Sequence, residues 1–302
     1  MKKLNSTQKI SLLSVITGLL ILVPACTKKE PSDCFIWKTE INGSTFYMAG
    51  SIHSAKEAYY PLPDTYTDYY KKADKVILEL EKDFEGIEQE IFNYAQKDTL
   101  PEEDYLNNHL KPESIEKLKQ ILEEDELDKY LQYEGWLLNM VIAGTKSKLL
   151  GFDPLLAIDR HFHELATKDN KEIIGLDDIK TQIVLFEFDA PILIQVQVLE
   201  NAISNMESQA EKELPLLEAY FADSLALFEE EFLKGMDFNI PQVKQAYDMV
   251  FTNRNKSWVE QFEKLSEENP ATYFVLVGAG HYFGPNNIRE LLEQKGYTVE
   301  KI

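Results

Sequence analysis

The chain of 302 residues carries 31 basic and 52 acidic side chains, which gives a formal net charge of −21. A charge of this sign repels nucleic-acid phosphates and anionic lipid headgroups, so the composition argues against nucleic acid as a partner. The length is enough for one large domain, or for one domain with a substantial insertion.

The first 25 residues have the features of a secretory signal peptide. Three lysines precede the apolar run 10–23, and the small residue Ala25 precedes Cys26. The apolar run is short for a spanning helix, which needs about 20 apolar residues. The residues L-V-P-A-C that end at Cys26 resemble the lipobox of bacterial lipoproteins, although Pro24 stands where a small or aliphatic residue is usual.

We therefore predict a lipoprotein signal peptide over residues 1–25, and a lipidated Cys26 with a tether over residues 26–34. The mature protein would be anchored outside the cytoplasm, in the bacterial cell envelope; ordinary secretion is the alternative. Loss of the three leader lysines leaves 28 basic and 52 acidic side chains, a charge of −24. With Cys26 lipidated only Cys34 remains, so an intramolecular disulfide and a cysteine-based zinc site are excluded.

Two short strands are expected at the start of the mature domain, over residues 35–40 and 44–50. They are separated by a segment that contains Asn-Gly at positions 42–43, a strong signal for a hairpin turn. A segment rich in tyrosine and proline then leads into a helix, and residues 75–80 (K-V-I-L-E-L) predict a buried strand.

The rest of the chain alternates long helical stretches with short apolar strands. Residues 84–148 have an acidic, helical pattern, with Pro101 and Pro112 at expected helix starts. A helix over 159–167 and a strand over 172–176 follow.

The C-terminal unit is a strand over 273–277, a helix over 287–295 and a strand over 298–301. Strands that alternate with helices predict an α/β fold. We expect a central mixed sheet with helices packed on it. The long helical stretches, approximately 84–150 and 180–265, would form a cap.

Four polar residues end or follow the predicted strands: His53, Glu79, Asp177 and His281. In open α/β sheets, ligands bind outside the carboxyl ends of the strands. Two imidazoles and two carboxylates delivered there would suit zinc, manganese, cobalt or iron. The pattern therefore predicts a metal site at this edge of the sheet.

Each residue also has a purely structural interpretation. A single histidine after a strand is more often a loop residue than a ligand, and Glu79 alone can pair with a neighbouring Lys or Arg. Asp177 can cap a helix that begins after it. The repeat of Gly-x-x-His after two apolar strands, at His53 and His281, makes the joint case stronger than any single member.

Several segments resemble the TraB/GumN family, to which the Tiki proteases are related. They are W-K-T-E-I-N-G-S-T-F-Y-M-A-G-S-I-H, A-D-K-V-I-L-E-L-E, G-F-D-P-L-L, I-I-G-L-D-D-I-K-T-Q, R-N-K-S-W and V-L-V-G-A-G-H-Y-F-G. Their order is preserved from Trp37 to the C-terminus, so the family-like domain is expected over residues 35–302. The paired Gly-x-x-His blocks are the most specific part.

The resemblance implies an α/β fold and, by analogy with the Tiki branch, metal-dependent hydrolysis of peptide bonds. The family's motif residues fall on His53, Glu79, Gln182, Arg254, Asn255 and His281. Asp177 stands where the family usually has Glu, a side chain longer by one methylene. A direct role for Asp177 is therefore less secure than the other assignments.

The resulting hypothesis is a lipid-anchored, metal-dependent hydrolase that cleaves peptides or small polypeptides. His53, Glu79 and His281 would hold a divalent zinc, manganese or cobalt ion, which lowers the pKa of a bound water to about 7. A second carboxylate, Asp177 or Glu79 itself if it is not a ligand, would take the proton as general base. Arg254 would orient a carboxylate or stabilise a developing anion, with a structural ion pair as the alternative.

Two other functions remain open from the sequence. The first is a cell-surface protein that binds or sequesters a peptide signal without cutting it, because function resides in the site and not in the fold. The second is capture of iron or haem by the histidines.

Overall fold

The computed structural model of the protein describes residues 34–187 and 190–302. The predicted signal peptide and the lipidated Cys26 lie outside the described residues. The sheet in the described part of the chain consists of β1 (Ile36–Ile41), β2 (Ser44–Ser51), β3 (Lys75–Leu78), β4 (Glu172–Gly175), β5 (Thr272–Gly278) and β6 (Val299–Lys301). The strand order is β4-β3-β5-β2-β1-β6.

The sheet is mixed, as predicted. Strands β4, β3, β5 and β2 are parallel to one another, while β1 runs antiparallel to both β2 and β6. The predicted hairpin is confirmed: Asn42 (φ 48°) and Gly43 (φ 84°) make the two-residue turn between β1 and β2. Positive φ at both turn positions matches the right-handed twist of the two strands, which explains the Asn-Gly pair.

Helices cover both faces of the sheet. Consecutive strand residues point to opposite faces, and Phe274 of β5 packs against Tyr70 of α1 (Asp64–Lys72) and Phe162 of α6 (Ile158–Lys168). The preceding residue, Tyr273, stacks on Phe46 of β2, which in turn contacts α12 (Asn253–Glu268). The short helix α13 (Ile288–Gln294) packs beside α12.

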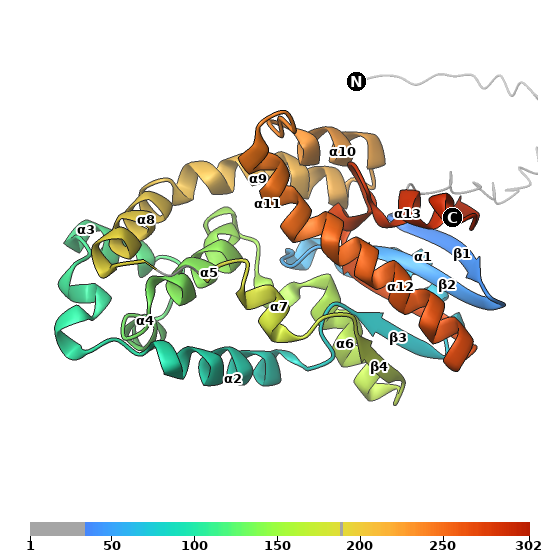
Figure 1. The fold of residues 1–302 in the computed structure, drawn as a ribbon, viewed down its shortest axis with the longest axis horizontal. Coiled ribbons are helices and arrows are strands. Elements are labelled where there is room, and N and C mark those ends of the chain that lie inside the picture. The colour runs from blue at the N-terminus through green and yellow to red at the C-terminus, as the bar shows by residue number, and fades with distance from the viewer. Residues whose placement is uncertain (1–33, 188–189) are drawn as a thin grey trace, which may run out of the picture. The chain divides into compact units, whose positions relative to one another are not determined.

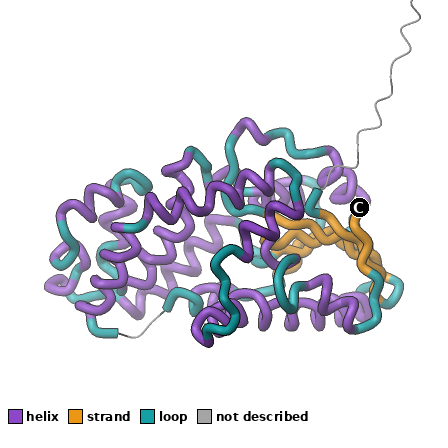
Figure 2. The backbone as a smooth tube through the Cα atoms, turned by 90° about the horizontal axis from the view of Figure 1, so that it is seen from above, coloured by secondary structure: helices purple, strands orange, loops and turns teal. Residues whose placement is uncertain are grey.

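The remaining helices are α2 (Phe84–Ala95), α3 (Pro112–Leu118), α4 (Glu124–Tyr130), α5 (Gly135–Thr145), α7 (Ile179–Ile183), α8 (Ile192–Ser204), α9 (Met206–Phe221), α10 (Leu225–Leu233) and α11 (Pro241–Tyr247). Helices α3, α4, α5 and α8 share a leucine-rich core that is separate from the core of the sheet. The strands therefore gather at one end of the domain, and these helices extend from it (Figures 1 and 2). None of the described helices is long and apolar enough to cross a membrane.

Candidate active site

The four residues predicted at strand ends lie at one edge of the sheet. His53 follows β2, Glu79 follows β3, and Asp177 follows β4. His281 lies in the 3-10 helix Ala279–Tyr282, directly after β5. Because these four strands are adjacent and parallel, their carboxyl ends meet at the same edge.

Three of the four side chains converge on Gly278, the last residue of β5. A Cβ at this glycine would lie 3.2 Å from Oε1 of Glu79, 3.6 Å from Cδ2 of His281 and 3.6 Å from Nε2 of His53. The backbone of Gly278 (φ −48°) is accessible to any residue. The glycine therefore avoids a tight contact with the Glu79 carboxylate, and the chain conformation does not demand it.

Arg254 of α12 connects the candidate residues. Its Nη2 donates to Oε2 of Glu79 at 2.5 Å, and its Nε donates to Oδ2 of Asp177 at 2.8 Å. Its Nη1 lies 3.3 Å from Nε2 of His281 and donates to the carbonyl of Val250. Val250 belongs to a π-helical turn, Asp248–Thr252, a distortion often found at functional sites.

Glu79 is held as an anion. Burial opposes the charge, but Arg254 and the two histidines favour it, and the net result lowers the pKa of Glu79 to about 2. The backbone N–H of Gly278 donates to Oε1 at 2.8 Å, and Gln182 donates to Oε2 at 3.3 Å. Both oxygens therefore have fixed positions.

His281 is neutral, and its tautomer follows from its neighbours. Burial lowers the pKa of His281 to about 3. Asn255 donates its Nδ2 to the carbonyl of Asn286, so its Oδ1 faces Nδ1 of His281 at 2.6 Å. Since Oδ1 only accepts, Nδ1 carries the proton and Nε2 accepts from Nη1 of Arg254.

His53 pairs with Asp159, a residue that we did not predict. Nδ1 of His53 lies 2.8 Å from Oδ2 of Asp159. The charge of Asp159 raises the pKa of His53 to about 9. The His53 side chain is 65% exposed, so water screens this pair. The Nε2 atom faces the edge where Glu79 lies.

Asp177 is enclosed. Its Oδ1 accepts from Nε1 of Trp258 and its Oδ2 accepts from Arg254, and its side chain is 6% exposed. Burial raises the pKa of Asp177, while its two partners, both of which donate to it, favour the carboxylate form. The capping role considered for Asp177 belongs to Asp178, which accepts from the backbone N–H of Thr181 at the start of α7.

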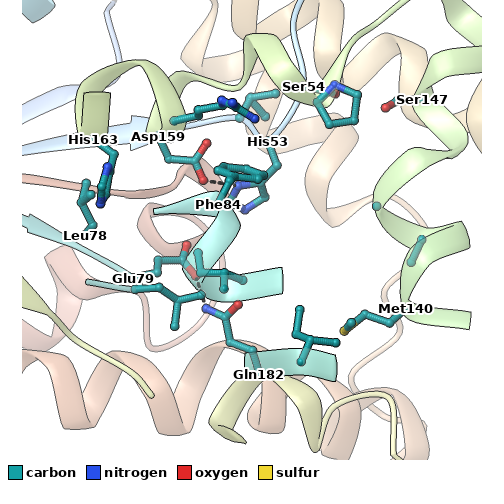
Figure 3. Close-up of a pocket in the computed structure, with 18 of the residues that line it drawn as sticks. His53, Ser54, Leu78, Glu79, Phe84, Met140, Ser147, Asp159, His163 and Gln182 are labelled. Atoms are coloured by element: carbon teal, nitrogen blue, oxygen red, sulfur yellow. Dashed lines mark hydrogen bonds and ion pairs between the residues drawn. The ribbon is translucent and has the colours of Figure 1, made fainter. Parts of the chain in front are cut away.

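A pocket of 580 Å³ borders His53 and Glu79 (Figure 3). Asp159 and Gln182 also line it, and Figure 3 shows them directed toward His53 and Glu79. Helices α2, α5 and α9, together with α7 and the segment after it, supply a mostly apolar wall that includes Phe84, Ile87, Ile91, Met140, Ile179, Phe186, Leu216 and Leu217. Arg254, Asp177 and His281 do not line the pocket.

The imidazole and carboxylate side chains at this edge are of the types that bind divalent metal ions. Both histidines have their Nδ1 next to an acceptor, which is the arrangement usual for metal-binding imidazoles. At neutral pH, however, the pKa of about 9 keeps a proton on Nε2 of His53, and Nε2 of His281 faces Nη1 of Arg254. The absent Cβ at Gly278 leaves room between Nε2 of His53 and Oε1 of Glu79. Within residues 34–187 and 190–302, no three His, Cys, Asp or Glu side chains already stand in a metal-holding arrangement. Arg254 contacts Glu79 and His281 at atoms that a metal would use.

The comparisons with known proteins identify the family. A profile of the TraB/PrgY/gumN family matches residues 35–301, so the chain belongs to this family, as the resemblance predicted. The uncharacterized protein YbaP of Escherichia coli (strain K12) is 24% identical over 260 residues, which cover 82% of this chain and 87% of that protein. YbaP of Shigella flexneri is 24% identical over 259 residues, with the same coverage of both chains.

Proposed function

We propose that this protein is a lipid-anchored, metal-dependent hydrolase of the bacterial cell envelope that acts on peptides. The observation that carries the proposal is the convergence of His53, Glu79 and His281 on Gly278, at the edge of a pocket. The two imidazoles would bind the ion through Nε2 once His53 has lost its proton and His281 its contact with Arg254, and Glu79 offers an anionic carboxylate. A bound zinc, manganese or cobalt ion would activate a water molecule and polarise the scissile carbonyl.

The residues have separate roles in this proposal. Glu79 borders the pocket and would either ligate the ion or, if it is not a ligand, accept the proton from water, and His53 and His281 are the other metal ligands. Arg254 and Asp177 are positioning residues, because neither lines the pocket and the N–H groups of Arg254 already have acceptors. Arg254 fixes Glu79, and Asp177 fixes Arg254.

The apolar wall of the pocket supports a substrate with at least one apolar group. A chamber of 580 Å³ has room for several side chains, and pockets of this size usually combine apolar walls with few polar groups. A peptide can place an apolar side chain against α2, α5 and α9 while its backbone carbonyl approaches His53 and Glu79. Neither nucleic acid nor a polyanion suits a chain of net charge −21.

Metal content is the first test of the proposal. The full chain would be analysed beside a His53→Ala/His281→Ala double variant after reconstitution with zinc, manganese or cobalt. We expect one ion in the wild type, loss of that ion in a variant with unchanged circular dichroism, and peptide cleavage only by the wild type. Equal metal content in both proteins would overturn the assignment of the ligands.

A protein that binds peptides without cutting them is the second candidate. The contacts of Arg254 with Glu79 and His281 favour it, because they engage two of the three ligands. Recovery of an intact peptide after prolonged incubation with the metal-loaded protein would support this function and contradict hydrolysis.

The lipid anchor is tested separately at Cys26. In a bacterial host, we expect the wild-type chain in the membrane fraction and a Cys26→Ala variant outside it. Equal membrane association of the two proteins would exclude lipidation of Cys26 as the anchor.

A further inference from the structure

We infer that Asp159 is a further positioning residue of the site: it holds neutral His53 in the tautomer and orientation that direct the Nε2 lone pair toward Glu79. This inference rests on the proposed function, because it assigns a task to Asp159 within the same site. No motif identified in the sequence includes Asp159, which is 106 residues from its partner.

Backbone hydrogen bonds hold together the two segments that carry His53 and Asp159. The N–H of Ile158, one residue before Asp159, donates to the carbonyl of Ile52, one residue before His53, at 3.1 Å. Two further backbone bonds, of 3.1 and 2.7 Å, join Ala55 to Asp153 in both directions. The loop that carries His53 is therefore clamped to the segment that begins α6, and this clamp sets the 2.8 Å contact.

The contact decides which imidazole nitrogen faces the site. A carboxylate only accepts, so neutral His53 carries its proton on Nδ1 and keeps a lone pair on Nε2. An unrestrained neutral imidazole prefers the opposite tautomer, with the proton on Nε2. Without Asp159, the nitrogen next to Glu79 would therefore mostly be a donor, and a metal could bind it only after the proton has moved to Nδ1.

Stability alone does not explain Asp159. Its partner is 65% exposed, and an exposed ion pair contributes little to folding. Its second oxygen, Oδ1, is buried and has no hydrogen-bond partner among the described residues, which is unfavourable for a carboxylate. A side chain with little net gain in stability, placed against a ligand that borders the pocket, fits a positioning role.

The two histidines of the site are held by different acceptors. His281 faces the neutral amide of Asn255, which is itself fixed by the carbonyl of Asn286, whereas His53 faces a full negative charge. A carboxylate partner raises the basicity of the ligand nitrogen. His53 is therefore the stronger ligand, and Asp159 controls the metal affinity of the site more than Asn255 does.

The test compares Asp159→Ala and Asp159→Asn with a matched control, Glu164→Gln, in the purified full chain. Glu164 lies on the same helix, α6, and its carboxylate pairs with Arg160 at the surface. Zinc affinity is measured by calorimetry, and the folded state is checked by circular dichroism. The tautomer of His53 is measured by two-bond ¹⁵N–¹H NMR of histidine-labelled protein, which contains five histidines. The metal-free spectra are recorded at about pH 10, above the pKa of His53.

We expect Asp159→Ala to move the proton of His53 to Nε2 and to weaken zinc binding by about 10- to 100-fold. Asp159→Asn keeps an acceptor but loses the charge, so we expect it to retain the Nδ1–H tautomer with an intermediate affinity. Glu164→Gln should match the wild type. A residue with only a structural role would change the unfolding temperature and leave the tautomer as it is.

Two results would overturn the inference. One is an unchanged His53 tautomer in folded Asp159→Ala, and the other is a zinc affinity within about twofold of the control when the wild type binds zinc. If the wild type binds none of the three metals, the proposed function fails. The tautomer measurement then still decides whether Asp159 positions His53.

Discussion

Replacement of Arg254 by methionine is the most direct test of how the site is held together. The guanidinium contacts two enclosed carboxylates, and the side chains of Arg254, Glu79 and Asp177 are 8, 14 and 6% exposed. Methionine has a similar length and can still pack on Trp258, over which the guanidinium lies at 4.6 Å. The variant Arg254→Met therefore removes the charge and leaves most of the packing.

The structure allows the loss of stability to be estimated in two ways. A pKa of about 2 for Glu79, against an ordinary value of 4.5, corresponds to about 3 kcal/mol of stability at neutral pH. Removal of one partner from a buried ion pair typically costs about 3–5 kcal/mol. We therefore expect Arg254→Met to lower the free energy of unfolding by about 3–5 kcal/mol.

The pH dependence provides an independent check of the same reasoning. In the wild type the pKa of Glu79 is lowered, so its contribution is present above about pH 4.5 and is lost as the pH falls toward 2. In the variant, burial without Arg254 raises the pKa above the unfolded value, so protonation relieves the unpaired charge. The difference in the free energy of unfolding between Arg254→Met and the wild type should therefore become smaller as the pH falls from about 7 to about 4.

Urea unfolding of the metal-free protein, followed by circular dichroism at several pH values, measures the difference. Arg160→Met is the matched control, because Arg160 pairs with Glu164 in a more exposed place and should change stability by less than about 1 kcal/mol. The double variant Arg254→Met/Glu79→Gln removes one of the two carboxylates that the single variant leaves unpaired. Its free energy of unfolding should exceed that of Arg254→Met by at least about 1 kcal/mol. If Arg254→Met loses no more stability than the control Arg160→Met, the description of Arg254 as the centre of a buried charge cluster is refuted.

Three further substitutions test other parts of the structure. Gly278→Ala places a methyl group 3.2 Å from the Glu79 carboxylate with no backbone strain, so we expect at least about a 10-fold loss of metal affinity by calorimetry with a nearly unchanged unfolding temperature. Gly144→Ala, whose added methyl would meet no atom within 4 Å, is its control and should leave that affinity intact. Gln195→Leu removes the acceptor for the backbone N–H of Gly135 and should cost about 1–3 kcal/mol in chemical unfolding; no change would mean that this N–H finds another partner. Gly43→Ala forces a side chain into a turn with φ 84° and should cost about 1 kcal/mol in the same assay, whereas a stabilised variant would contradict the turn assignment.

Sequence patterns predicted the local structure of the sheet well, because the signals are local. Asn42-Gly43 specifies a hairpin through its positive φ angles, and the apolar run of β5 marks a strand covered on both faces. The order of the strands is not local information. His53, Glu79 and His281 meet only because β3, β5 and β2 are neighbours, although β5 is last of the three in the chain.

Partners distant in sequence could not be predicted in the same way. Asp159 is one carboxylate among many in an acidic chain, and its position in the second place of α6 is also typical of an acidic residue near a helix start. Arg254 stood out through the family resemblance, but its simultaneous contacts with Glu79, Asp177 and His281 depend on how α12 crosses the sheet. The search for polar residues at strand ends therefore finds side chains that face the candidate site. It misses residues on neighbouring helices, such as Asp159, that fix those side chains in position.

The net charge of the candidate site is compatible with both Arg254 and the proposed metal ion. Glu79 and Asp177 carry two negative charges and Arg254 carries one positive charge, while His281 is neutral and the His53–Asp159 pair contributes no net charge when His53 is protonated. The cluster therefore retains one negative charge at the side that faces the pocket, where Glu79 lies. In the proposed function, a divalent cation would compensate that charge and replace the proton of His53 at Nε2, so metal binding should release a proton. Arg254 holds the two carboxylates in place without a metal, and the remaining negative charge would favour binding of a cation.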